Sequence, residues 1–428
     1  MEVLNQQLKP VKAQSARALS FVLEEHLTAA QLLIDQHSQT AKLIELTLQD
    51  LQLDAHLDGL RVDSESAWKI ISSALESAEV STVFLATVLA LEGKHTARLK
   101  QLLALAEANQ ALKPGVFKAF TWIPDHITRP LLPHLRSSAA TLHQQLALHL
   151  CHQHHIRAET YLEWAITHTN ADIRNMGLTA AGDTGETSLL ELCLRAQQSD
   201  QTSTRYAAAR AATLLGESTQ SIRTLQSIAL GDEQYQPPSL SLIAVFLPLD
   251  QAHSFLTKLR AHTSNNRLLV TVAGELGGAN NVPALLRLMQ DPKLARIAAF
   301  SFCFITGLDL VEHNMEANAP EDFETGPNDD PDDDNVESDP DEDLPWPDRN
   351  KLMQWWEQHG SSFKPGIRYL MGKEITREHC LDVLEFGNQA QRKIAALHLK
   401  KMDPASPLFL IDAPAWRQQA RLQLLRNS

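Results

Sequence analysis

Apolar and polar residues between positions 172 and 307 follow a helical period, and the pattern recurs about every thirty residues. Four stretches place an Arg ahead of small residues and close on Gly. They are DIRNMGLTAAGDTG (172–185), STRYAAARAATLLGE (203–217), NRLLVTVAGELGG (266–278) and LARIAAFSFCFITG (294–307). Small residues allow a neighbouring helix to approach closely, so each stretch predicts the first helix of a repeat.

The spacing of the arginines supports a repeat. Arg174, Arg205, Arg267 and Arg296 are separated by 31, 62 and 29 residues, and the interval of 62 equals two periods. The segment SLSLIAVFLPL (239–249) supplies the missing first helix without the Arg. A second amphipathic stretch follows each first helix, at 188–196, 221–230, 252–260 and 282–289. Two helices per repeat that bury their apolar faces on their neighbours predict an α-solenoid.

The rest of the chain is also expected to be helical, apart from one acidic segment. We predict an N-terminal helical cap (1–63), degenerate helical repeats (64–168), the repeats themselves (169–317), an acidic flexible loop (318–343) and a C-terminal helical region (344–428). The helix QRKIAALHLKK (391–401) suggests a final repeat. The predicted fold class is therefore all-α: a HEAT-like α-solenoid with an N-terminal cap and an acidic loop inserted before the C-terminal repeat.

Charge is concentrated in that loop. The chain has a formal net charge of −14, but Glu321 to Asp343 alone holds 13 Asp and Glu and no Lys or Arg. Without this segment, 39 acidic residues face 38 basic ones. A nearly neutral remainder disfavours a nucleic-acid-binding surface, which requires clustered cations. No apolar stretch is long enough to span a bilayer, and the N-terminus lacks the apolar core of a secretory signal, so we expect a cytoplasmic protein.

Four cations on the second helices form the first candidate site. Arg195, Arg223, Lys258 and Arg287 lie 28, 35 and 29 residues apart, close to the repeat period. Each interrupts an apolar pattern, so each is expected to point away from the core and to contribute to a basic ridge. We hypothesise that the acidic segment from Asn318 to Asp343 occupies this ridge until an acidic partner displaces it. The alternative is a solvated linker beside ordinary surface charges.

Aromatic residues form the second candidate site. Trp346, Trp355 and Trp356 follow the acidic segment, and they either anchor a partner or pack into the core beside the preceding repeat. Four histidines, His149, His152, His154 and His155, form a candidate metal site, but no carboxylate has matching spacing. The four cysteines lie far apart with no CxxC pair, which disfavours a zinc knuckle or a disulfide framework. The sequence therefore predicts no metal site, no cofactor and no catalytic residue.

Several short motifs resemble an uncharacterised proteobacterial HEAT-repeat family often encoded near type VI secretion genes, with repeats of the phycobilisome-lyase type. These motifs are LDAHLDGLRV (53–62), FITGLDL (304–310), DEDLPWPD (341–348), the pair Trp355–Trp356 and APAWRQQ (413–419). The resemblance implies a bacterial cytoplasmic protein with an accessory role in secretion, and no catalytic residues are assigned to that family.

Two classes of function follow from this reading. The first is a non-catalytic scaffold or adaptor that binds a protein, such as an accessory or chaperone for a type VI secretion effector or spike component. The second is an enzyme with an unrecognised ligand or metal site between helical repeats. We expect the first, with no nucleic acid or membrane as partner.

Overall fold

The described part of the chain is mostly α-helical, which confirms the predicted all-α class. The computed structural model describes residues 19–34, 41–321, 323 and 339–427. It divides into two compact units, one of residues 1–180 and 412–423 and one of residues 181–411 and 424–428. No helix in the described part of the chain is both long enough and apolar enough to cross a bilayer.

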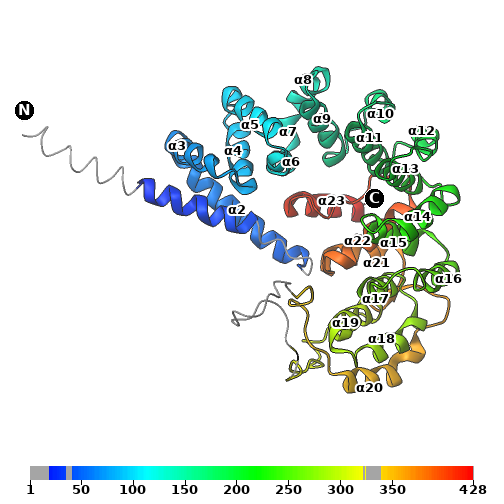
Figure 1. Cartoon of the computed structure of the whole chain (residues 1–428). Coiled ribbons are helices and arrows are strands. Elements are labelled where there is room, and N and C mark those ends of the chain that lie inside the picture. The colour runs from blue at the N-terminus through cyan, green and yellow to red at the C-terminus, as the bar shows by residue number, and fades with distance from the viewer. Residues whose placement is uncertain (1–18, 35–40, 322, 324–338, 428) are drawn as a thin grey trace, which may run out of the picture. The chain divides into compact units, whose positions relative to one another are not determined.

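The first unit is a succession of helices joined by short turns (Figure 1). After a helix at 19–34, its elements are α2 (Leu43–Val62), α3 (Ser64–Ala74), η1 (Leu75–Ser77), α4 (Val80–Glu92), α5 (Thr96–Ala108), η2 (Gln110–Leu112), α6 (Lys113–Trp122), α7 (Asp125–Thr128), η3 (Arg129–Leu131), α8 (Leu132–Ser137), α9 (Thr141–Gln153) and α10 (Glu159–Ile166). Helix α4 is buried almost all round and packs against α6. Gly115 allows this approach, because a Cβ there would lie 2.5 Å from the carbonyl oxygen of Val80.

The C-terminal helix α23 (Ala415–Asn427) returns to the first unit for most of its length, which the sequence did not predict. Its start is fixed by the Asp50 carboxylate, which accepts a hydrogen bond from the backbone N–H of Ala415. The Arg417 guanidinium donates to the carbonyl oxygens of Thr121 and Gln153. A side chain that satisfies carbonyls at helix ends is stabilising, because those groups have no partner within their own helix.

The second unit contains most of the helices predicted between residues 172 and 307. Its elements are η4 (Thr187–Leu189), α12 (Leu190–Ala196), α13 (Thr202–Leu214), α14 (Gln220–Gly231), α15 (Gln236–Phe246), α16 (Leu249–Leu259), α17 (Asn266–Glu275), η5 (Ala279–Asn281), α18 (Val282–Leu288), α19 (Pro292–Thr306), α20 (Arg349–His359), η6 (Gly360–Ser362), β1 (Tyr369–Leu370), β2 (Lys373–Glu374), α21 (Arg377–Phe386) and α22 (Gln389–Met402), with α11 (Ala171–Thr184) at the border between the units. Every first and second helix expected from the pattern between 172 and 307 is present.

The four repeat glycines have a backbone conformation that favours glycine. Gly185, Gly216, Gly277 and Gly307 all have positive φ, between 68° and 100°. A residue in this left-handed conformation commonly ends a helix, and glycine adopts it without steric cost. The sequence signal that closed each first helix on Gly therefore corresponds to the observed end of that helix.

The second unit also contains a small hairpin within the region predicted to be helical. Strands β1 and β2 pair antiparallel around Met371 and Gly372, both of which have positive φ. The hairpin docks on the ends of two repeat helices, because Met371 N–H donates to the carbonyl of Phe304 and Tyr369 N–H donates to that of Gly277. These are the only strands among the described residues.

The last repeats share a hydrophobic core with α20. Phe302 lies at its centre without solvent exposure, and buried side chains of α17, α18 and α19 surround it. Figure 1 shows α18 beside α20. Helix α19 packs against α17, and its Phe302 also contacts Trp355 and Trp356 of α20.

Candidate functional site: a clasp between repeat arginines and the acidic segment

Two of the repeat arginines reach the acidic segment. Arg267 lies in the first turn of α17, where the Asn265 side chain caps the helix by accepting from the N–H of Leu268. Arg296 lies in the second turn of α19, which begins with Asp291 as N-cap and Pro292 in the first position. Capped starts fix both helix ends, and therefore the positions from which both arginines project.

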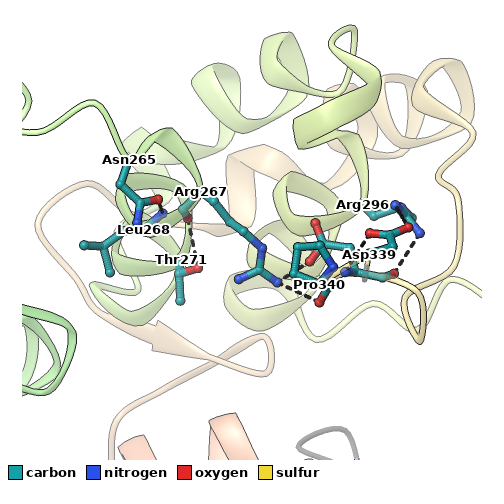
Figure 2. Close-up of polar contacts among 8 residues, drawn as sticks. Asn265, Arg267, Leu268, Thr271, Arg296, Asp339 and Pro340 are labelled. Carbon is teal, nitrogen blue, oxygen red and sulfur yellow. Dashed lines mark hydrogen bonds and ion pairs between the residues drawn. The ribbon is translucent and has the colours of Figure 1, made fainter. Parts of the chain in front are cut away.

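The two guanidinium groups bind the turn formed by Asp339, Pro340 and Asp341 (Figure 2). Arg267 donates to the Pro340 carbonyl oxygen at 3.1 Å and forms an ion pair with the Asp341 carboxylate. Arg296 donates to the Asp341 carbonyl oxygen at 2.9 Å and forms an ion pair with Asp339. We call these five residues the clasp.

The clasp is largely shielded from water. The side chains of Arg296 and Asp339 are only 7% and 11% exposed, and that of Asp341 is 4% exposed, whereas the Arg267 side chain is 39% exposed. The Arg296–Asp339 pair is therefore screened little by salt, and removing one partner of such a pair is destabilising. The clasp is therefore a specific contact and differs from the weak surface pairs expected of a solvated linker.

Aromatic rings complete the pocket around Arg296. Its guanidinium carbon lies 4.5 Å from the centre of the Trp346 ring and 5.4 Å from that of Phe323. Trp346 and Phe323 themselves meet edge to face, with ring centres 4.8 Å apart. Arginine over an aromatic face gains a cation–π contribution. Trp346, one of the three tryptophans singled out from the sequence, thus has an intramolecular partner.

The two ends of the acidic segment are also joined by backbone hydrogen bonds. The N–H of Ala317 donates to the Trp346 carbonyl at 2.8 Å, and the N–H of Asp348 donates to the Met315 carbonyl at 2.8 Å. Glu316 and Pro347 form an antiparallel bridge between these two bonds. The segment therefore leaves and re-enters the fold at one place.

The described end of the acidic segment does not bind the predicted ridge. Asp339 and Asp341 contact arginines of the first helices, whereas the ridge residues belong to the second helices. Residues 322 and 324–338, the greater part of the predicted loop, lie outside the described residues. From the sequence, Arg267 and Arg296 indicated only the spacing of the repeat, and no binding role was predicted for them.

The four ridge residues are all solvent-exposed, as their positions predict. They are Arg195 on α12, Arg223 on α14, Lys258 on α16 and Arg287 on α18. None of them forms an ion pair with another described residue. They therefore remain cations available to a partner.

Trp355 and Trp356 pack against the core. Both rings meet Phe302 edge to face, with ring centres 5.8 and 6.3 Å apart. Each is partly exposed, and Trp355 also stacks on His359. This placement agrees with the interpretation of these residues as part of the core beside the preceding repeat.

Within the histidine cluster, His149 lies within hydrogen-bonding distance of other groups of the protein. His149 Nε2 lies 2.7 Å from the Thr121 hydroxyl and 3.1 Å from the Phe117 carbonyl oxygen. Burial lowers the pKa of His149 to about 3 and that of His154 to about 4. Among the described residues, no group of three or more His, Cys, Asp or Glu side chains is placed to hold a metal ion.

Comparison with other proteins adds no family to this picture. Neither protein-family models, nor curated proteins, nor solved structures gave a match to this chain.

Proposed function

We propose that the protein is a non-catalytic adaptor, a HEAT-like α-solenoid that binds an acidic segment of a partner protein on its repeats. The observation that carries this proposal is the clasp. Two arginines from successive repeats hold an Asp-Pro-Asp turn, so the repeats already contain the chemistry needed to bind an acidic polypeptide.

The exposed ridge extends this chemistry along the repeats. Arg195, Arg223, Lys258 and Arg287 supply one cation per second helix, in a molecule whose other charges nearly balance outside the acidic segment. Complementary charge accelerates association with an acidic partner and disfavours basic ones. The family resemblance motivates the finer proposal that the partner is a type VI secretion effector or spike component in the bacterial cytoplasm.

A charge-reversal experiment tests the adaptor. The tagged wild-type chain and a variant with Arg195→Glu, Arg223→Glu, Lys258→Glu and Arg287→Glu are used to capture proteins from the native host. The matched control reverses four other exposed cations of the same unit, Arg260, Lys293, Lys364 and Lys373.

We expect one partner to be retained stoichiometrically by the wild type and the control and to be lost from the ridge variant. Retention by all three chains would contradict a role for the ridge. A bound metal or small molecule in the purified protein would instead favour the alternative, an enzyme with a site between repeats.

A further inference from the structure

An open polar groove lies along the exposed face of α14. It has a volume of about 820 Å³, and its other wall is the chain that links α12 to the first turn of α13. The α14 residues that line it recur every three or four positions from Gln220 to Gly231. The twelve residues of α14 extend about 16 Å from the first to the last, because each step along a helix rises ~1.5 Å. An extended peptide of about five residues has that length.

The groove is rich in hydrogen-bond donors. Arg223 of the ridge lines it from α14, and Arg205 lines it from α13. Arg205 is held in place by the carbonyl oxygens of Ser199 and Asp200, at 3.0 and 2.8 Å. Asp232 is the one acidic residue in the lining. Two cations against one carboxylate favour an anionic ligand.

A buried side-chain amide beside the groove has only one of its two polar atoms hydrogen-bonded. Gln197 is only 4% exposed, and its Oε1 accepts a hydrogen bond from the Thr224 hydroxyl at 2.8 Å. Its Nε2 has no hydrogen-bond partner among the described residues. A buried donor without an acceptor is destabilising by about 1–3 kcal/mol. A ligand that brings a carbonyl or carboxylate oxygen to this nitrogen removes that penalty.

We propose that this groove binds an extended acidic segment of a partner protein, with carboxylates on Arg223 and Arg205 and a further oxygen on the Gln197 amide. The inference rests on the proposed adaptor function and names one of its contact sites. The peptide class follows from the length of the groove, because a single small anion occupies only a fraction of it.

Fluorescence anisotropy of a labelled hexaglutamate peptide, added to the full chain at low salt, tests the proposal. Arg223→Ala should raise the Kd about tenfold, because it removes a charge-assisted hydrogen bond. Gln197→Met keeps the charge and the approximate volume but removes the amide, so it should also raise the Kd severalfold. Thermal melting of both variants checks that the repeats remain folded.

The control is Lys373→Ala, which removes an exposed cation of the same unit that belongs neither to the groove lining nor to the ridge. It should change the Kd by less than twofold. Equal effects of Lys373→Ala and Arg223→Ala, or no effect of Gln197→Met in a folded protein, would overturn the groove in favour of diffuse attraction. Competition by inorganic phosphate as effective as that by unlabelled peptide would assign the groove to small anions and overturn it as well.

Failure of the groove can be distinguished from failure of the adaptor. If the peptide depends on Arg223 and Gln197 while the captured partner does not respond to reversal of the ridge, the groove stands and the proposed function is wrong. If charge reversal of the ridge abolishes capture of the partner but neither groove variant changes the Kd of the peptide, the proposed groove site is wrong and the proposed adaptor function is retained.

Discussion

The arginine that precedes the small residues of each predicted first helix has a different kind of partner in the early and in the late part of the region between 172 and 307. Arg174 and Arg205 donate to carbonyl oxygens five and six residues earlier in the chain, at His168 and Thr169 for the first and at Ser199 and Asp200 for the second. Arg267 and Arg296 instead bind the clasp turn, 43 to 74 residues later. The arginine of the repeat pattern thus forms hydrogen bonds with nearby carbonyl oxygens in one pair of helices and long-range contacts in the other pair.

The position of the arginine within its helix explains the difference. Arg174 and Arg205 are each the fourth residue of their helix, whereas Arg267 is the second and Arg296 the fifth. Each step along a helix turns a side chain by about 100°. Helical side chains also point back toward the N-terminus, so a residue in the fourth position can reach the carbonyls of the preceding turn.

The glycines that follow the first helices also contact different segments in the early and in the late part of this region. A Cβ on Gly185 would lie 2.5 Å from the Ala405 carbonyl oxygen, in the loop after α22. A Cβ on Gly307 would meet the backbone of Met371 in the hairpin at the same distance. The early and late repeats are therefore closed by different parts of the C-terminal chain.

The largest expected effect concerns the two kinds of arginine. Arg296→Ala should destabilise the second unit by roughly 3–5 kcal/mol, because it removes one partner of a shielded ion pair with Asp339 and the hydrogen bond to the Asp341 carbonyl oxygen. Arg205→Ala should cost only about 1 kcal/mol, since it removes hydrogen bonds to partly solvated carbonyls. Urea unfolding of the two variants measures the difference. An equal loss of unfolding free energy in the two variants would mean that the clasp is no stronger than the local hydrogen bonds of Arg205.

A second prediction concerns the core that only the late repeats share with α20. Trp355→Ala should lower the free energy of unfolding by roughly 3–5 kcal/mol, because its ring packs on the buried Phe302. Trp416→Ala, at a ring that is 42% exposed, serves as the control and should cost much less. An unchanged melting curve for Trp355→Ala together with loss of partner binding would move this tryptophan to an interface.

The smallest expected stability effect depends on pH and on the loop that closes the early repeats. Lys400 is buried, its ammonium donates to the carbonyls of Pro404 and Ser406, and burial lowers its pKa to about 8. Between pH 8 and the usual lysine value the unfolded chain binds more protons, so this group makes stability rise with pH.

The rise should amount to about 1–2 kcal/mol between pH 7.5 and 9.5. Urea unfolding at both pH values measures it as the difference between the wild type and Lys400→Met, so that other titrating groups cancel. A difference that stays constant or falls with pH would contradict the lowered pKa.

The sequence predicted the helices and their ends better than their distant partners. Period, capping and glycine are local signals, and they placed α19 with its Asp291 cap and its closing Gly307. The return of α23 to the first unit depends on Arg417 meeting carbonyls almost 300 residues away, and no local pattern encodes that. The hairpin strands have two residues each, too few to show an alternating pattern.

The sequence predicted the charged residues of the candidate site but not which of them contact each other. Regularly spaced cations and a dense acidic segment were evident, and the exposure of the ridge followed from its place in an apolar pattern. Which arginines bind the acidic segment depends on helix position and on the reach of the returning chain. The sequence offered two alternatives, contact of the segment with the ridge or a solvated linker, whereas the described Asp339 and Asp341 bind arginines of the first helices.

The central claim is that Arg267 and Arg296 form a site for an acidic segment, which the chain's own Asp-Pro-Asp turn occupies. A labelled peptide of residues 337–348, titrated into the full chain, tests it most directly. The tethered turn competes at a high effective concentration, so the wild type should bind the peptide weakly. Asp339→Ala with Asp341→Ala should bind it at least tenfold more tightly, and adding Arg296→Ala should abolish the gain. Equal affinity of the wild type and the double variant, or a gain that persists without Arg296, would contradict the account.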